Sequence, residues 1–213
     1  MAVGIVAAVS WALITGGEGS LSGPWLFVSL IGPQLTMLGF VVWVSRSKGR
    51  GVVADLRLEI TWRDVGLGLA FALGGLIAAG VVSELISALL GDDPSAAVAD
   101  LLTEADDGNG LDGWLVITAV SGATVVPVAE ELAFRGLWWS ALEKRGMSSL
   151  AAFLVSSAVF AVFHLEPLRL PVLMVLGMAL GAGRLVTGRI GAGIVAHALV
   201  NGLAFTALLV ELS

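Results

Sequence analysis

The sequence contains no cysteine. That absence excludes disulfide bonds, a cysteine nucleophile, thiolate metal sites and S-acylation. Charged residues are also scarce: they make up 13% of the chain, hydrophobic residues make up 57%, and the mean hydropathy is +0.97. A soluble domain of this size needs far more polar surface. The composition therefore predicts an integral membrane protein in a lipid bilayer, and the lack of any basic stripe argues against nucleic acid as a partner.

Long apolar runs, separated by polar interruptions, predict an all-α fold: a polytopic membrane helix bundle of about seven transmembrane helices. We expect a single domain over residues 1–213, since no internal repeat and no linker is found. The first run starts at Met1 without a basic region before it, so we interpret it as a retained span rather than a signal peptide. The expected spans lie at about residues 2–16, 24–45, 65–90, 113–142, 148–165, 168–186 and 190–210.

The charges between these runs predict the orientation of the protein. If the spans alternate in direction, most lysines and arginines fall on one side of the membrane, and by the positive-inside rule that side is cytoplasmic. The loop at 92–112 is acidic, which suits the outer face. We therefore expect a multi-pass protein of the cell membrane with a cytoplasmic N-terminus and an external C-terminus. The basic residues of the cytoplasmic side are Arg46, Lys48, Arg50, Arg57, Arg63, Lys144, Arg145, Arg184 and Arg189.

Three smaller features refine this topology. Segment 52–64 mixes charged with apolar residues, and we interpret it as an interfacial cytoplasmic segment. Gly177 and Gly181 have a small-xxx-small spacing, which permits close helix packing. Six tryptophans lie near expected span ends, as an aromatic belt at the membrane surfaces requires. They are Trp25, Trp43, Trp62, Trp114, Trp138 and Trp139.

Three of the expected spans carry polar or aromatic residues one helical turn apart. Glu131 and Arg135 share a helix face, and we expect a buried ion pair between them. Glu130 points about 100° away from Glu131 on a helix, which leaves it without a partner nearby on its own helix. Pro127, one turn earlier, frees a backbone carbonyl and is expected to bend the helix. The other two pairs are Phe160 with His164 and His197 with Asn201.

Each pair taken alone has a structural interpretation, as an ion-pair clamp or as a hydrogen-bonding contact between helices. Taken together, they supply one unpaired acid, two histidines and an asparagine. These are the groups needed to activate a water molecule and to stabilise an oxyanion. A charged side chain at the centre of a bilayer costs about 2.5–3.5 kcal/mol even on the mildest scale. Three such residues within six positions therefore point to a function.

At these positions the chain resembles a known family. The stretches EELAFR, FAVFH and HALVN look like the three motifs of the CPBP intramembrane proteases, a group of CAAX prenyl endopeptidases and bacteriocin-processing enzymes. The motifs occur in order, one per span, over about residues 111–210, whereas the N-terminal half matches only in being apolar. The resemblance implies an intramembrane endopeptidase that hydrolyses peptide bonds of membrane-associated or lipidated substrates.

The resemblance also implies roles for individual residues. Glu130 is expected to activate water with His164 in contact with it, while His197 and Asn201 hold the oxyanion. The residues expected to organise the site are Glu131, Arg135 and Phe160. We expect no cofactor and a glutamate-type mechanism. A zinc ion on Glu130, His164 and His197 is the alternative, since two histidines and a glutamate form a known zinc set.

Other classes of function remain as alternatives. The same fold could serve as a non-catalytic membrane scaffold or self-immunity factor. Intramembrane acids and histidines also form proton relays, but transport predicts inverted repeats, which the sequence does not show. No His-Glu-x-x-His or Gly-x-Ser-Gly sequence indicates another protease type. The sequence predicts neither the particular substrate nor the oligomeric state.

The depth of the motif residues leads to one further prediction. At 1.5 Å per residue, Glu130 lies about 21 Å from Lys144, whereas His197 lies about 12 Å from Arg189. Straight, parallel helices would leave these groups at different depths. We therefore predict that the fourth span is long, tilted and bent, and that the motif residues line one cavity open to the cytoplasmic side.

Overall fold

The computed structural model describes residues 23–91, 94 and 113–212. Within these ranges the chain is helical and contains no strand, and the predicted polytopic helical bundle is confirmed. The expected span at about residues 2–16 lies outside the described residues. The helices are α2 (Gly23–Lys48), α3 (Val52–Leu56), α4 (Trp62–Leu90), α6 (Gly113–Glu130), η1 (Glu131–Trp138), α7 (Trp139–Lys144), α8 (Ser149–Phe163), α9 (Leu170–Thr187) and α10 (Gly191–Glu211).

Five helical segments of the described ranges are long and apolar enough to cross a membrane. They are α2, α4, the continuous segment formed by α6, η1 and α7, then α9 and α10. α8 is also apolar but has only 15 residues, fewer than the roughly 20 that a bilayer core of about 30 Å requires. The six expected spans that fall in the described ranges are thus all helices.

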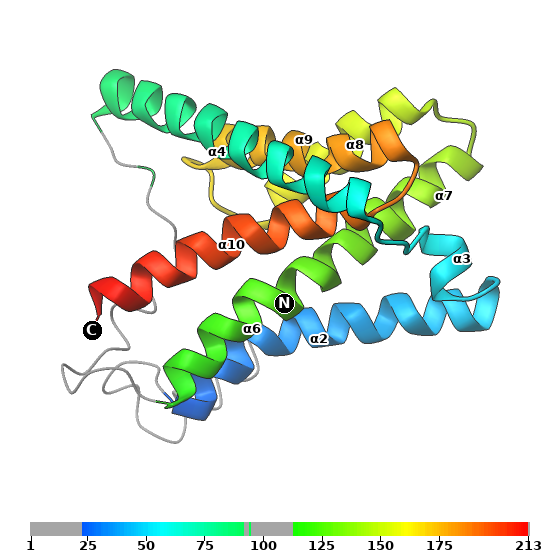
Figure 1. The fold of residues 1–213 in the computed structure, drawn as a ribbon, viewed down its shortest axis with the longest axis horizontal. Coiled ribbons are helices and arrows are strands. Elements are labelled where there is room, and N and C mark those ends of the chain that lie inside the picture. The colour runs from blue at the N-terminus through cyan, green and yellow to red at the C-terminus, as the bar shows by residue number, and fades with distance from the viewer. Residues whose placement is uncertain (1–22, 92–93, 95–112, 213) are drawn as a thin grey trace.

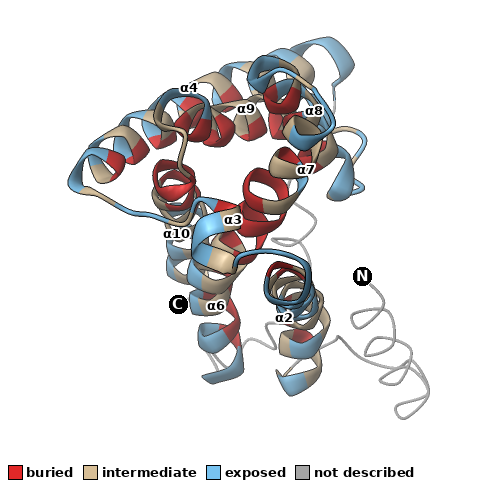
Figure 2. Ribbon diagram, turned by 90° about the vertical axis from the view of Figure 1, so that its right-hand side faces the viewer, coloured by how far each residue is buried: buried red, intermediate tan, exposed pale blue. Residues whose placement is uncertain are grey.

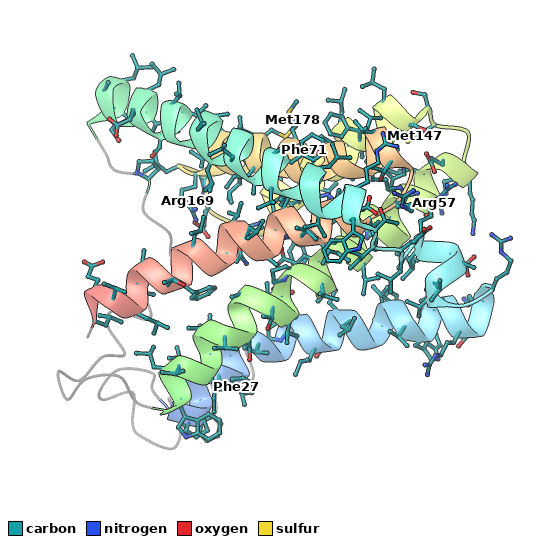
Figure 3. All side chains as sticks on the ribbon, viewed as in Figure 1. Phe27, Arg57, Phe71, Met147, Arg169 and Met178 are labelled. Carbon is teal, nitrogen blue, oxygen red and sulfur yellow. The ribbon has the colours of Figure 1, made fainter. Side chains whose placement is uncertain are left out.

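Successive long helices run in opposite directions (Figure 1). α2, α6 and α9 run from the left of the view to the right, and α4, α8 and α10 return. α4 packs against α9 and α10, α6 packs against α2 and α10, and α8 packs against α9. The ends joined by α3 and α7 lie at the right. Figure 3 labels Arg57 and Met147 there, and it shows Arg169 in the opposite half of the bundle.

Buried residues gather where η1, α9 and α10 face one another (Figure 2). The main apolar cluster includes Phe134, Phe160, Leu180 and Ile194. The outer side of α4, in contrast, exposes a row of large apolar side chains, as a helix facing lipid does. The polar motif residues described below therefore lie in the protein interior, away from the lipid-facing side of α4.

Two glycines bring α9 close to α8. A Cβ atom on Gly177 would lie 3.0 Å from the ring of Phe160, and one on Gly181 would lie 3.1 Å from the ring of Phe153. Both distances are tighter than ordinary van der Waals contact. The close packing predicted from the small-xxx-small spacing is therefore present.

Segment 52–64 comprises α3, a short turn and the first turn of α4. Thr61 caps α4, since its N–H donates to the Asp64 carboxylate and the N–H of Asp64 donates to the Thr61 hydroxyl. The N–H of Arg50 donates to Asp55 and holds the pKa of that partly buried carboxyl below its usual value. Leu56 is fully buried, so one side of α3 packs on protein. The interfacial position of the segment stays a prediction.

Trp139 does not belong to the predicted aromatic belt. Its side chain is only 1% exposed, and its ring packs on Phe153 with centroids 6.2 Å apart. The guanidinium of Arg184 lies 5.0 Å from the centre of the same ring. The prediction was wrong for this residue because an indole near a helix end packs inward where a neighbouring helix offers a ring and a cation. Trp62, by contrast, is 90% exposed.

Candidate active site

The first motif lies where the fourth span changes its helical geometry. α6, η1 and α7 form one segment of 32 residues from Gly113 to Lys144, which confirms the predicted length. The π-helix η1 begins at Glu131, four residues after Pro127. π-Helical turns are rare and are frequent at functional sites. The sequence pattern did not predict this change.

The predicted ion pair between Glu131 and Arg135 is present. Arg135 Nη1 lies 3.0 Å from Glu131 Oε1, and both side chains are fully buried. Arg135 Nη2 donates to the carbonyl of Gly177 at 2.6 Å, and its guanidinium lies 4.5 Å from the centre of the Phe160 ring. One side chain therefore ties the first motif to α8 and α9.

A second buried arginine, Arg184 of α9, supports η1 from outside the motifs. It donates to the backbone carbonyls of Arg135 and Gly136, the latter at 3.2 Å. Its other nitrogen lies 3.2 Å from Glu143. Sequence reasoning placed Arg184 among the basic loop residues of the cytoplasmic side. It instead reaches inward, because two backbone carbonyls of η1, the Ser140 hydroxyl and the Glu143 carboxylate accept charge-assisted hydrogen bonds from it there.

His197 of α10 lies between the two adjacent glutamates. Its Nδ1 is 3.3 Å from Glu131 Oε1, and its Nε2 is 3.8 Å from Glu130 Oε2. The ring also contacts Phe160, with centroids 5.7 Å apart. One imidazole thus faces both acids of the first motif, each with a different nitrogen.

Glu130 has a partner that sequence reasoning missed. Gln34 of α2 donates from Nε2 to Glu130 Oε1 at 3.1 Å. The spacing within the motif correctly left Glu130 without a partner on its own helix, but it carried no information on which helix packs beside it. The signal in the sequence was a lone glutamine in the middle of an otherwise apolar span.

His164 lies at the end of α8, where its Nδ1 is 2.8 Å from the carbonyl of Phe160. Because a carbonyl only accepts, this contact places the proton on Nδ1 and leaves Nε2 as an acceptor. The rings of His164 and Phe160 are in contact, with centroids 4.7 Å apart. The expected contact between His164 and Glu130 is wrong: within the described residues it is His197 whose ring nitrogen approaches Glu130.

Asn201 lies one turn after His197 on α10. Its Nδ2 donates to the carbonyl of Gly122 in α6 at 3.0 Å. This contact orients the amide toward α6, and the amide retains a second N–H that can donate to another group.

The four predicted catalytic residues line one cavity of about 570 Å³. The remaining lining is mostly apolar and comes from α2, α6, α8, α9 and α10. Two partly buried residues of the α8–α9 connection, Glu166 and Arg169, also line the cavity and form an ion pair at 2.6 Å. The lining residues with candidate chemistry are Glu130, His164, His197 and Asn201.

The cavity lies in the half of the bundle away from the basic helix ends. Its lining takes residues 29–34 of α2, the first part of α9 from Leu173, and α10 from His197 to Leu208. It reaches the surface region of Arg169, which Figure 3 shows far from Arg57. The predicted opening toward the basic side is therefore wrong. The fourth span projects beyond the start of α10 at the basic end, so Glu130 and His197 meet although they lie at different distances from their helix ends.

The alternative zinc set is not assembled in the part of the chain that the structure describes. No three His, Asp or Glu side chains there lie close enough together to hold a metal ion. Glu130, His164 and His197 share the cavity wall but do not converge on one point as ligands.

Comparison with known proteins agrees with this geometry. Residues 112–203 match a family model described as type II CAAX prenyl endopeptidase Rce1-like. The matched segment contains all three motifs, and it supports a protease of the CAAX type. This match supports the CPBP/CAAX protease family, and the resemblance read from the motifs is confirmed. No curated protein and no solved structure matches the chain.

Proposed function

We propose that this protein is an intramembrane endopeptidase that hydrolyses peptide bonds of membrane-associated or lipidated substrates. One observation carries the proposal: three helices bring Glu130, His164, His197 and Asn201 to the wall of a single cavity. Hydrolysis of a peptide bond requires a general base, a group that accepts a hydrogen bond from the water, and N–H donors for the oxyanion. Residues able to supply each of these groups line this cavity. The family match supports the same class of reaction.

In the proposed reaction, Glu130 takes a proton from a water molecule while the water oxygen attacks the carbonyl carbon of the substrate. His164 assists by accepting a hydrogen bond from the water at Nε2. The second amide N–H of Asn201 and the Nε2–H of His197 donate to the oxyanion that forms; His197 acts as an imidazolium in this step, since its Nδ1–H faces the Glu131 carboxylate. When the tetrahedral intermediate collapses, the C–N bond breaks and Glu130 passes its proton to the leaving nitrogen. The products are a new carboxylate and a new amine.

The buried residues around the cavity organise this arrangement. Glu131 accepts the ion pair from Arg135 and contacts Nδ1 of His197, so it fixes the orientation of that imidazole. Phe160 packs against the Arg135 guanidinium and both histidine rings. These residues hold the reacting groups in place and need not touch the substrate.

The cavity also bears on the substrate. Its volume falls in the range of about 300–1,000 Å³ that is typical of ligand sites, and its mainly apolar lining suits apolar residues of a membrane-associated peptide. We propose that the basic helix ends face the cytoplasm, following the positive-inside rule. In that orientation the cavity opens toward the outer side of the membrane.

We propose that the reaction proceeds without a metal ion, because the candidate donors do not converge as ligands. Cleavage is then unchanged when the protein is dialysed against a chelator. Loss of cleavage in the chelator and its return with added zinc would contradict this part of the proposal.

The proposal is tested by comparing two glutamate variants with the wild type on a membrane-anchored peptide in liposomes. Glu130→Gln keeps the shape of the side chain but removes the base, and we expect no measurable cleavage. Glu84→Gln is the matched control, because Glu84 is an exposed residue of α4 that does not line the cavity. Near wild-type turnover by Glu130→Gln would contradict the assignment, and equal loss in both variants would point to a defect in folding.

A further inference from the structure

A polar residue from outside the three motifs reaches the proposed catalytic acid. Gln34 lies on α2, which is not part of the segment matched by the family model. Its Nε2 donates to Glu130 Oε1 at 3.1 Å, and its side chain lines the same cavity. Pro33, directly before it, lies within α2 and also lines the cavity.

The two oxygens of Glu130 face two different helices. Oε1 accepts from Gln34 of α2, while Oε2 lies 3.8 Å from His197 Nε2 of α10. A carboxylate held at one oxygen by a fixed donor cannot rotate freely about its last bond. The contact with Gln34 therefore sets which oxygen is presented to His197 and to the cavity.

The other groups around Glu130 show what Gln34 adds. η1 brings the Glu131–Arg135 pair, α10 brings His197, and α8 places His164 on the cavity wall. Each of these is charged or titratable. Gln34 supplies the contact from α2 and is neutral at every pH, so its effect on the carboxylate does not change with its own protonation.

Gln34 is a polar side chain within a mainly apolar helix. Polar side chains within membrane spans are uncommon unless they serve a function. Its Nε2 donates to Glu130, whereas its Oε1 has no hydrogen-bond partner within the described residues. The donor nitrogen is therefore the part of the amide that contacts the site.

We propose that Gln34 is a positioning residue, which orients the Glu130 carboxylate and stabilises its charged form for removal of a proton from water. The inference rests on the proposed function, in which Glu130 is the base. It assigns a role in catalysis to α2, a helix outside the motif-bearing segment.

The test measures kcat and KM against pH for Gln34→Met and Gln34→Glu, with Thr36→Val as the control. Methionine has a similar length but no donor. Glutamate keeps the shape but, when ionised, has no donor and adds a second negative charge beside Glu130. Thr36 is exposed on the same helix, and its hydroxyl donates to the carbonyl of Gly32. One hydrogen bond to a charged group corresponds to about a tenfold to hundredfold change, so we expect kcat to fall by that factor in both Gln34 variants while KM stays nearly constant.

The pH profile separates positioning from a merely structural role. Without the donor, the charged form of Glu130 is less stabilised, so the acidic limb of the kcat profile moves to higher pH for Gln34→Met and further for Gln34→Glu. A wild-type profile and kcat in Gln34→Met, or a raised KM with unchanged kcat, would overturn the inference. If Gln34→Met does not fold, Gln34→Asn takes its place, since its shorter side chain keeps the amide but cannot reach Glu130.

The two sets of variants distinguish failure of the inference on Gln34 from failure of the proposed function. If Glu130→Gln is inactive and Gln34→Met behaves as the wild type, only the inference on Gln34 is wrong. If Glu130→Gln retains activity, the proposed function itself is wrong.

Discussion

Arg135 connects three separate parts of the site. Its guanidinium contacts Glu131 of η1, the carbonyl of Gly177 in α9 and the ring of Phe160 in α8. Buried charges are costly unless each one has a partner, so the pair is stable only as a unit. The first motif therefore also holds η1, α8 and α9 together.

Arg135→Ala is expected to destabilise the fold more than Glu130→Ala. The change leaves Glu131 as a buried charge without its cation, and breaking a buried pair typically costs about 3–5 kcal/mol. Thermal melting of both variants in the same detergent measures the difference. If Arg135→Ala melts at the same temperature as Glu130→Ala or above it, the pairing does not stabilise the protein as described.

Asn201→Ala is expected to reduce cleavage less than Glu130→Gln. Loss of one oxyanion donor typically lowers the rate by about 10²–10³, whereas loss of the base removes the reaction. The rates are compared by single-turnover cleavage at saturating enzyme. An Asn201→Ala variant with the wild-type rate would show that its amide only holds α10 to Gly122.

At the residue scale, the spacing of residues along one helix predicted contacts within that helix, but it did not predict contacts between helices. The four-residue spacing predicted the pair Glu131–Arg135 and left Glu130 unpaired on its own helix. It could not indicate that Gln34 approaches Glu130, or that His197 rather than His164 lies beside it. Those contacts depend on which helices pack together, and periodicity within one segment does not encode that.

At the element scale, the close approach of α10 to η1 determines how much space the Glu131 carboxylate has. Gly193 of α10 faces Glu131, and a Cβ atom on it would lie 2.6 Å from Glu131 Oε2. No real Cβ contact is that short, so a side chain at position 193 must displace the carboxylate or the helix. His197 lies one turn further along α10 and would move with it.

Gly193→Ala is therefore expected to lower both stability and activity. Overpacking of a buried contact typically costs about 1–3 kcal/mol, and the displaced Glu131 no longer orients His197. Gly202→Ala on the same helix is the control, because a Cβ atom there meets nothing within 4 Å. Melting temperature and cleavage rate are measured for both. Equal behaviour of the two variants would contradict the close approach.

Apolar run lengths predicted the helices well but not their irregularities. The expected span at about 168–186 is α9 (Leu170–Thr187), and that at about 190–210 is α10 (Gly191–Glu211). The π-helix η1 was not predicted, because its side-chain pattern differs little from that of an α-helix. The hydrogen bond from Arg184 to a backbone carbonyl of η1 was not predicted either, since an arginine near a helix end is normally interpreted as a loop residue in the sequence.

At the scale of the whole molecule, the cavity and the basic helix ends lie in opposite halves. The basic helix ends lie together, as the alternation of the spans predicts, and their cytoplasmic position stays a prediction. The sequence analysis placed the cavity opening on that same side. Counting residues along a straight helix gives the depth of a residue within that helix. It does not show how far the helix is shifted along its axis relative to its neighbour. Here the fourth span extends beyond α10, so the motif residues meet away from the basic end.

Cysteine labelling is expected to show these two halves on opposite sides of the membrane. The chain has no native cysteine, so Arg50→Cys and Leu165→Cys each provide a single reactive site. Both positions are exposed, the first after α2 and the second in the α8–α9 connection beside the cavity. A membrane-impermeant maleimide applied to intact cells should label position 165, and position 50 only after permeabilisation. The reverse pattern would contradict the proposed orientation.

The most direct test of the hydrolytic site is a single-turnover cleavage of a membrane-anchored peptide in ¹⁸O-labelled water. If Glu130 activates water that attacks the substrate carbonyl, the new C-terminal carboxylate of the product carries one ¹⁸O atom after the first turnover. Mass spectrometry of the cleaved peptide measures this label. Absence of cleavage by the folded wild-type protein, or a first-turnover product without the label, would contradict the account.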